Sequence, residues 1–116
     1  GPAGLMAAEA MAEAGLSVTV CEAKPSVGRK FLMAGKSGLN LTKDEAGSSF
    51  RAAFAEGRKP LTPMIDAFDA DAVQAWAKGL DQEVFTGSTG RIFPVAMKAS
   101  PLLRAWMTRS CPLVKP

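Results

Sequence analysis

The sequence predicts an α/β fold, and three patterns near its beginning indicate it. Residues 2–14 are rich in Ala, Met and Glu, as helices are, and Gly15 follows where a left-handed cap is favoured. Residues 17–21 are rich in β-branched side chains and alternate as strands do. Glu22 ends this strand, and Pro25 enforces a turn soon afterwards. A helix that leads directly into a strand belongs to a βαβ-like unit, so we expect a parallel sheet.

The same segment carries a spaced pattern with a physical reason for each position. Gly1 allows the backbone to approach a pyrophosphate, and Gly4 allows the helix to pack closely on a strand. Ala8 and Met11 continue the helical face of Gly4, which we expect to be turned to the sheet. The carboxylate of Glu22 stands at the strand end, where it can accept hydrogen bonds from an adenosine ribose. The pattern predicts a Rossmann-like dinucleotide-binding domain.

The acid at position 22 favours FAD or NAD over NADP, because a 2′-phosphate would be repelled there. This pattern alone leaves the choice between FAD and NAD open. The chain begins inside the pattern, without the first glycine of Gly-x-Gly-x-x-Gly or the strand before it. We therefore expect a partial sequence in which the first strand of the domain is missing.

The middle of the chain is less regular. Glycines with interspersed Arg and Lys indicate an irregular loop over residues 26–42, with a short helical turn around residues 29–33. Residues 44–60 have the least pattern, although Phe50 and Phe54 stand four apart and indicate a short helix.

Thr62 and Pro63 are typical of a helix cap and first helical position, so we expect a short helix from there through Phe68. Asp69 predicts the N-cap of a second helix, which ends at Gly79. Its apolar side chains share one face: Val73, Trp76, Ala77 and Leu80.

Residues 82–85 and 91–93 are short extended segments around a Gly-rich turn, which predicts a β-hairpin. Ser100 and Pro101 repeat the cap-plus-proline pattern and predict a last helix, which Pro112 ends. The stripe that this helix buries consists of Leu102, Leu103, Trp106 and Met107. We interpret both tryptophans, Trp76 and Trp106, as core residues.

Composition excludes several classes of function. The net charge is +3, and its basic residues are scattered without interleaved aromatics, so we expect no nucleic acid partner. No apolar run approaches the length of a membrane span. There is no His for Ser-His or Cys-His catalysis, and Cys21 and Cys111 match no metal or redox spacing. We therefore name no catalytic residue and no metal ligand, and reduced thiols favour the cytoplasm.

Two later motifs resemble those of a known family. Residues 28–42 read G-R-K-F-L-M-A-G-K-S-G-L-N-L-T and resemble the G-R-K-x-L-x-x-G-x-G-R-C-N-x-T loop of the HI0933-like family. That family comprises bacterial NAD(P)/FAD-dependent oxidoreductases. Residues 90–94 and 98–100 resemble its G-R-x-F-P and K-A-S elements. The G-L-N at residues 38–40 stands where many members have G-R-C-N, and we interpret it as a subtype.

The resemblance implies a set of FAD contacts. Gly1, Ala3 and Gly4 would hold the pyrophosphate, and Glu22 would hold the adenosine ribose. The remaining implied contacts are Arg29 and Lys30 along the ADP moiety, and Ser37, Gly38, Asn40 and Thr42 near the ribityl chain and isoalloxazine. Without the resemblance, Arg29 and Lys30 could equally be a solvent-exposed basic pair, and Asn40 could equally be a turn residue.

The resemblance further implies a longer flavoprotein. Residues 1–45 would be the N-terminal part of its FAD/NAD(P)-binding Rossmann domain, and residues 46–116 a helical continuation ahead of a substrate domain. The parent protein would be an FAD-dependent oxidoreductase with a small-molecule substrate and NAD(P)H as a candidate electron donor, and we expect the isolated chain to be inactive. The alternatives are an NAD-binding Rossmann module and a non-catalytic partial product with weak nucleotide binding. Arg91 would either reach substrate or flavin, or pair with Asp81 or Glu83.

Overall fold

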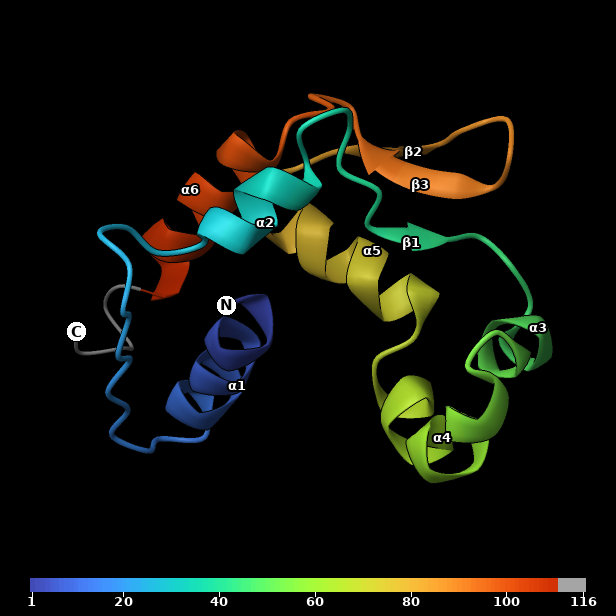
Figure 1. The fold of residues 1–116 in the computed structure, drawn as a ribbon, viewed down its shortest axis with the longest axis horizontal. Coiled ribbons are helices and arrows are strands. Elements are labelled where there is room, and N and C mark those ends of the chain that lie inside the picture. The colour runs from blue at the N-terminus through green and yellow to red at the C-terminus, as the bar shows by residue number, and fades with distance from the viewer. Residues whose placement is uncertain (111–116) are drawn as a thin grey trace. The chain divides into compact units, whose positions relative to one another are not determined.

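The computed structural model describes residues 1–110 and divides into two compact units. Unit 1 comprises residues 1–38 and the chain from residue 98 onward, and unit 2 comprises residues 39–97. The described part of unit 1 is helical, whereas unit 2 combines helices with a small sheet (Figure 1). This mixture of helices and strands confirms the predicted α/β class. Cys111 and the predicted helix end at Pro112 lie outside the described residues.

The first helix, α1, spans Pro2–Glu13, as the composition predicts. It ends at a glycine with left-handed backbone, because Gly15 has φ of +84°. The Gly15 N–H donates to the Ala12 carbonyl at 3.0 Å, and the Leu16 N–H donates to the Met11 carbonyl at 3.0 Å. These two bonds form a Schellman cap, which needs a residue without a Cβ penalty at this position.

The predicted strand over residues 17–21 is wrong as a sheet element. Thr19 makes a single β-bridge, and none of the three sheet strands includes this segment. Val18 is nevertheless buried against Ala8 and Ala12 of α1. A parallel ladder requires a neighbouring strand, and every strand of the described chain lies in unit 2. The segment therefore packs on α1 without forming the expected parallel sheet.

Helices α2, Arg29–Ala34, and α6, Ala99–Ser110, pack on each other in unit 1 (Figure 1). Helix α2 confirms the helical turn predicted around residues 29–33. The ring of Phe31 meets that of Trp106 edge to face, with centroids 6.0 Å apart. Trp106 is buried, as predicted for a core residue.

Helix α6 begins at Ala99, so Ser100 is inside its first turn and is not the cap that the sequence predicted. Pro101 is still tolerated, because the amides of the first turn have no partner within a helix. The buried stripe largely follows the prediction: Leu102 and Leu103 are buried, whereas Met107 is half-buried.

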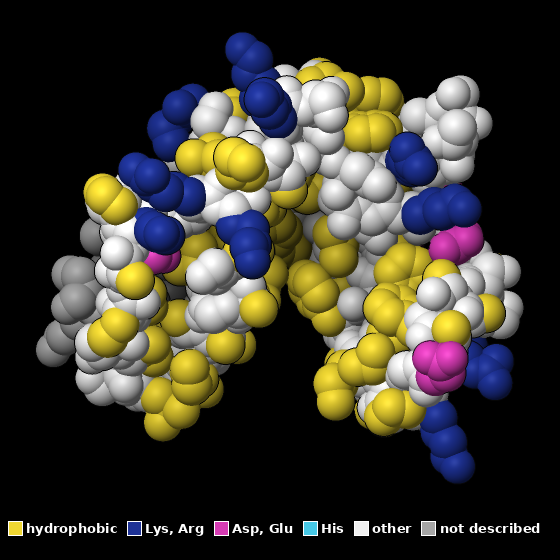
Figure 2. All heavy atoms as spheres, viewed as in Figure 1, with side chains coloured by type: hydrophobic (Ala, Val, Ile, Leu, Met, Phe, Trp, Pro, Cys, Tyr) yellow, Lys and Arg dark blue, Asp and Glu magenta, His cyan; other side chains and the backbone are white. Residues whose placement is uncertain are grey.

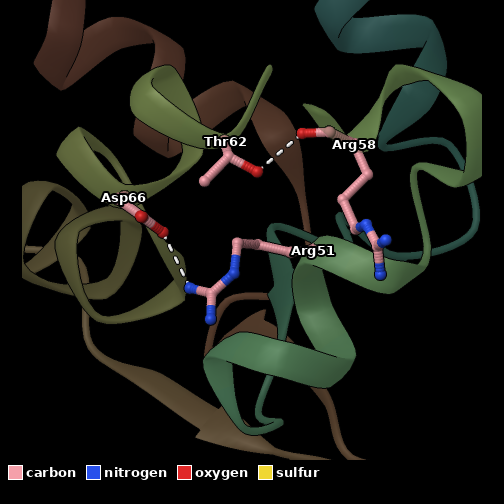
Figure 3. A network of polar contacts seen from close by, with 4 residues as sticks. All are labelled: Arg51, Arg58, Thr62 and Asp66. Carbon is pink, nitrogen blue, oxygen red and sulfur yellow. Dashed lines mark hydrogen bonds and ion pairs between the residues drawn. The ribbon is translucent and has the colours of Figure 1, made fainter. Parts of the chain in front are cut away.

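Unit 2 contains α3 at Gly47–Ala52, the 3₁₀ helix η1 at Ala55–Gly57 and α4 at Arg58–Ala67. Helix α3 confirms the predicted short helix, and the rings of Phe50 and Phe54 lie 5.8 Å apart. Figure 3 shows the link between α3 and α4, where Arg51 Nη1 donates to Asp66 Oδ1 at 2.8 Å.

The predicted start of α4 is wrong. The helix begins at Arg58, and Thr62 is not a cap, because its hydroxyl donates back to the Arg58 carbonyl at 2.6 Å (Figure 3). Pro63 lies inside the helix. Pro60 stands in the first turn, where its missing N–H has no helical partner, and Pro63 removes only the bond to the Lys59 carbonyl. Thr62 and Pro63 therefore lie inside the helix and not at its start, and the helix tolerates both of its prolines.

Helix α5 spans Ala70–Gly79, and its N-cap Asp69 accepts the Ala72 N–H at 2.9 Å, as predicted. Strands β2, Val84–Thr86, and β3, Arg91–Pro94, form the predicted hairpin with Phe85 opposite Phe93.

A third strand, β1 at Thr42–Lys43, was not predicted; it pairs antiparallel with β3, which gives the order β1-β3-β2. Helix α5 contacts β1 and β2, and the core residues Ala77, Leu80 and Ile92 are buried. The sheet of unit 2 is thus a small antiparallel sheet covered on one face by a helix.

Candidate functional site

A groove between α1 and the segment after it brings together three of the predicted cofactor residues. The groove has a volume of about 200 Å³, and Gly1, Gly4 and Glu22 all line it. The other lining residues are Leu5, Ala8, Met11, Val18, Thr19, Val20 and Cys21. Three of the four positions predicted to contact a pyrophosphate or a ribose therefore lie on one surface of unit 1, whereas the fourth, Ala3, does not line the groove.

The amino end of α1, where Gly1 and Gly4 line the groove, carries backbone hydrogen-bond donors without helical partners. The Leu5 N–H makes the first helical bond, to the Gly1 carbonyl at 3.1 Å, so the amides of Ala3 and Gly4 have no partner within the helix. Both residues are exposed, and no acidic side chain stands in the first turn. Free N–H groups and the positive end of the helix dipole make this terminus favourable for an anion.

The helical face formed by Gly4, Ala8 and Met11 is only partly covered, contrary to prediction. Ala8 is buried, but Met11 is 43% exposed. A Cβ placed on Gly4 would meet no atom within 4 Å. Of the strand-like residues that were expected to bury this face, Val18 is buried against it and Val20 packs there only partly buried. In the described chain Gly4 therefore borders the groove and does not support close helix–strand packing.

Glu22 is the acidic residue of the groove lining. It is exposed, and its Oε1 accepts the backbone N–H of Lys24 at 3.0 Å. This bond orients the carboxylate. Its second oxygen has no hydrogen-bond partner among residues 1–110, so it is available to accept a hydroxyl of a bound ligand.

Arg29 and Lys30 occupy the first turn of α2, and both are exposed. Arg29 Nε donates to Ser26 Oγ at 2.9 Å, so this guanidinium is held near the start of the helix. Arg29 lines a shallow surface depression whose other lining residues are Ser26, Leu32, Met33 and Lys36. Neither Arg29 nor Lys30 lines the groove that contains Glu22.

The remaining predicted contacts are divided between the two units. Ser37 is exposed and Gly38, with φ of +135°, is half-buried at the end of the unit 1 segment. Asn40 is exposed in unit 2, and Thr42 lies in β1. The Leu41 N–H donates to the Ile92 carbonyl at 2.9 Å, which holds this part of the loop along β3.

Two glycines of the family-like loop serve helix packing, which the sequence reading missed. A Cβ on Gly35 would lie 2.5 Å from Ala99 Cβ, and one on Gly28 would lie 2.7 Å from a methyl of Leu103. Gly28 also has φ of +78°. The two glycines that flank α2 thus allow it to approach α6. A glycine at each end of the short helix is the sequence feature that could have predicted this close packing.

A buried carboxylate joins the two ends of unit 1, and it too was missed. Glu9 is only 3% exposed, accepts the indole N–H of Trp106 at 3.2 Å and accepts Arg109 Nε at 2.7 Å. Its spacing from Leu5 and Ala12 placed it on the buried face of α1. That spacing was a signal of burial, although nothing local could identify donors about a hundred residues away.

Charge is unequally distributed between the two units. Residues 1–38 and 98–110 contain seven Lys and Arg but three Glu, a net charge of +4. Residues 39–97 contain six Lys and Arg and eight Asp and Glu, a net charge of −2. Figure 2 shows basic side chains gathered over α2 and α6. Unit 1 therefore presents the more favourable field for an anionic ligand.

Arg91 does not make the ion pairs that were considered for it. Within the described chain it pairs with neither Asp81 nor Glu83, and it is exposed. Trp76 is half-buried on α5, so it is a less complete core residue than predicted. Cys21 is an exposed free thiol in the groove lining.

A family model described as the HI0933-like protein Rossmann domain matches residues 1–112. No curated protein matches the chain significantly. The helices among residues 1–110 include none that is both long and apolar enough to cross a membrane. The matched range includes the groove, the α2 loop and the hairpin.

Proposed function

The chain belongs to the HI0933-like family, and we propose that its unit 1 holds the ADP half of FAD in a flavin-dependent oxidoreductase. The observation that carries this proposal is one groove lined by Gly1 and Gly4, at the amino end of α1, and by Glu22. A Rossmann-type family module is expected to bind a dinucleotide at such a helix end.

The residues present fit the chemistry of an adenine dinucleotide. The free amides of Ala3 and Gly4 suit a pyrophosphate, and the available oxygen of Glu22 suits a ribose hydroxyl. Arg29 and Lys30 would add positive charge along the ADP moiety. The carboxylate of Glu22 would disfavour a 2′-phosphate, which supports FAD or NAD over NADP as the resident dinucleotide.

The preference for FAD over NAD rests on the loop at residues 28–42. By its resemblance to the family loop, Ser37, Gly38, Asn40 and Thr42 would approach the ribityl chain and isoalloxazine. Bound flavin would supply the hydride or electron transfer, and the chain would bind and orient it. NAD(P)H would serve as electron donor. We also propose that residues 1–45 belong to the nucleotide-binding domain and residues 46–116 to its helical continuation.

The test is a ligand comparison at Glu22. In ¹⁵N NMR titrations of the 116-residue chain, we expect weak, saturable ADP binding and about tenfold weaker binding of 2′-deoxy-ADP, the loss of a hydrogen bond to a charged group. Glu22→Ala should bind both ligands equally weakly. Glu13→Ala, an exposed acid at the end of the same helix, is the matched control and should keep the preference for ADP.

The flavin half has its own arm in the same experiment. FMN should shift the amides of residues 37–42, whereas nicotinamide mononucleotide should not. If Glu22→Ala still binds ADP more tightly than 2′-deoxy-ADP, Glu22 does not accept the ribose hydroxyl. Equal responses to the two mononucleotides would favour an NAD-binding module over an FAD-binding one.

A further inference from the structure

We propose that the outer face of the β1-β3-β2 sheet in unit 2 binds a small planar anion, an aromatic or conjugated ring that carries a carboxylate or phosphate. The proposal does not depend on FAD binding by unit 1. It begins from the pairing of two basic residues. Lys43 of β1 is the register partner of Arg91 of β3. Side chains of directly opposed residues lie on the same face of a sheet.

This pair is one in which side chains approach closely. The Asp44 N–H donates to the Gly90 carbonyl at 2.8 Å and flanks the pair, which marks Lys43 and Arg91 as a non-hydrogen-bonded pair. The Cα atoms of such pairs are about 4.5 Å apart. The stem of Lys43 also lies over the turn, since a Cβ on Gly90 would be 3.8 Å from Lys43 Cε.

The pair lies on the exposed side of the sheet, beside two aromatic rings. Ile92 is 1% exposed and faces the core, so its neighbours Arg91 and Phe93 face outward. The rings of Phe93 and Phe85 lie 5.9 Å apart at 31°, and Phe85 is 42% exposed. Figure 2 shows basic side chains next to hydrophobic ones in the region of the hairpin.

On the β2 side of β3, the position opposite Arg91 carries no side chain. Gly87 is the residue beside it, with its N–H bonded to the Arg91 carbonyl at 2.7 Å, and it has no side chain. Arg91 has no ion pair among the described residues. Lys43 Nζ lies 3.6 Å from Glu45 Oε2, so this acid compensates one cation of the pair only. Like charges directly opposed destabilise a sheet, and an anion bound between them would remove that repulsion.

These features define the chemical class of the ligand. A guanidinium and an ammonium bind carboxylate or phosphate, and the two rings offer a surface for offset stacking of a flat ligand. The net charge of −2 on residues 39–97 opposes the approach of a long polyanion. A small molecule with one or two charges is therefore favoured over a nucleic acid strand.

The experiment titrates the 116-residue chain with probes that separate ring from charge. Benzoate and phenyl phosphate should both shift the amides of residues 42–44 and 85–93, and the tighter of the two identifies the preferred acid. Cyclohexanecarboxylate, which has the charge without the flat ring, and benzyl alcohol, which has the ring without the charge, should each bind at least threefold more weakly.

Variants assign the effect to this face. Arg91→Gln should weaken the better probe at least fivefold, and Phe85→Leu about threefold. Arg58→Gln, at an exposed arginine of α4 in the same unit, is the matched control and should change nothing. Lys43→Gln provides a second cation variant should Arg91→Gln alter the hairpin spectrum.

Several results would overturn the proposal. If benzyl alcohol binds as tightly as benzoate, charge plays no part in recognition. If Arg58→Gln and Arg91→Gln lose the same affinity for the probe, the binding does not take place on this face. Tighter binding of a short oligonucleotide than of either probe, or self-association of the chain through residues 85–93, would assign the surface to another partner.

Discussion

At the scale of single residues, Glu9 connects the two ends of unit 1. Its carboxylate is buried and accepts bonds from Trp106 and Arg109 of α6. Hydrogen bonds from a cationic and a neutral donor offset the cost of burying this polar group. The local sequence could indicate burial from the spacing to Leu5, but the donors come from the opposite end of the chain.

Removal of this carboxylate should destabilise the chain. We expect Glu9→Ala to lower the free energy of unfolding by about 1–3 kcal/mol, because it removes the buried carboxylate to which the Trp106 indole N–H donates. Arg109 remains partly exposed and can turn to water, so the loss stays below that of a fully buried pair. Urea unfolding measures the effect. Glu13→Ala is the control, and equal losses in the two variants would contradict the role given to Glu9.

Replacement of Gly4 by Ala should have opposite effects on the stability of the chain and on its affinity for ADP. An added methyl group meets no atom, so Gly4→Ala should stabilise the chain by about 0.5–1 kcal/mol through helix propensity. The same methyl group borders the groove and should weaken ADP binding several-fold. Thermal unfolding and the NMR titration measure the two effects.

Gly15 provides the contrasting case. Gly15→Ala must place a Cβ at φ of +84°, so it should destabilise the chain and leave the ADP affinity unchanged. Loss of both stability and affinity in Gly4→Ala would show that Gly4 is a packing residue after all.

At the scale of elements, the short helix α2 owes its position to glycines. A Cβ added to Gly35 would lie 3.1 Å from the backbone nitrogen of Ala99, and one added to Gly28 would meet the side chain of Leu103. The resemblance had pointed to this loop as a flavin contact, and the packing gives these two positions a separate reason. One loop thus combines residues that fix α2 on α6 with residues proposed to approach the cofactor.

Gly35→Ala should test this packing directly. We expect it to destabilise the chain by about 1–3 kcal/mol, the usual cost of overpacking, because the methyl group meets backbone that cannot easily move. Gly47→Ala is the matched control, since its methyl group would meet only the flexible end of Arg51. Urea unfolding that ranks the two variants equally would contradict the account of α2.

Elements with a local chemical signal could be predicted, and those set by distant partners could not. The cap at Gly15, the cap at Asp69 and the hairpin around residues 86–90 follow from backbone requirements of the residues themselves. The strand expected at residues 17–21 depends on a neighbour that the described chain does not provide. The start of α4 was misplaced because two prolines fit the same helix.

Strand β1 shows the same limit. Its two residues, Thr42 and Lys43, are too short a run for any alternation to appear, and they become a strand only because β3 lies beside them. The candidate site divides similarly. Gly1, Gly4 and Glu22 could be grouped from spacing alone, whereas the relation of residues 28–42 to this groove could not be inferred from any local pattern.

At the scale of the whole molecule, charge and chemistry divide between the two units. Unit 1 carries the positive excess and the proposed nucleotide groove, and unit 2 carries a negative excess with one basic pair on its sheet. This distribution would direct an anionic dinucleotide to unit 1 through long-range attraction. Binding of ADP should accordingly weaken as ionic strength rises.

The most direct test of the central claim is an NMR map of FAD on the chain. We expect weak, saturable FAD-induced shifts at residues 3–5 and 22–24, reproduced by ADP, with further shifts over residues 28–42 that ADP does not reproduce. An FAD titration that leaves residues 3–5 and 22–24 unshifted would contradict the assignment of the groove to the dinucleotide.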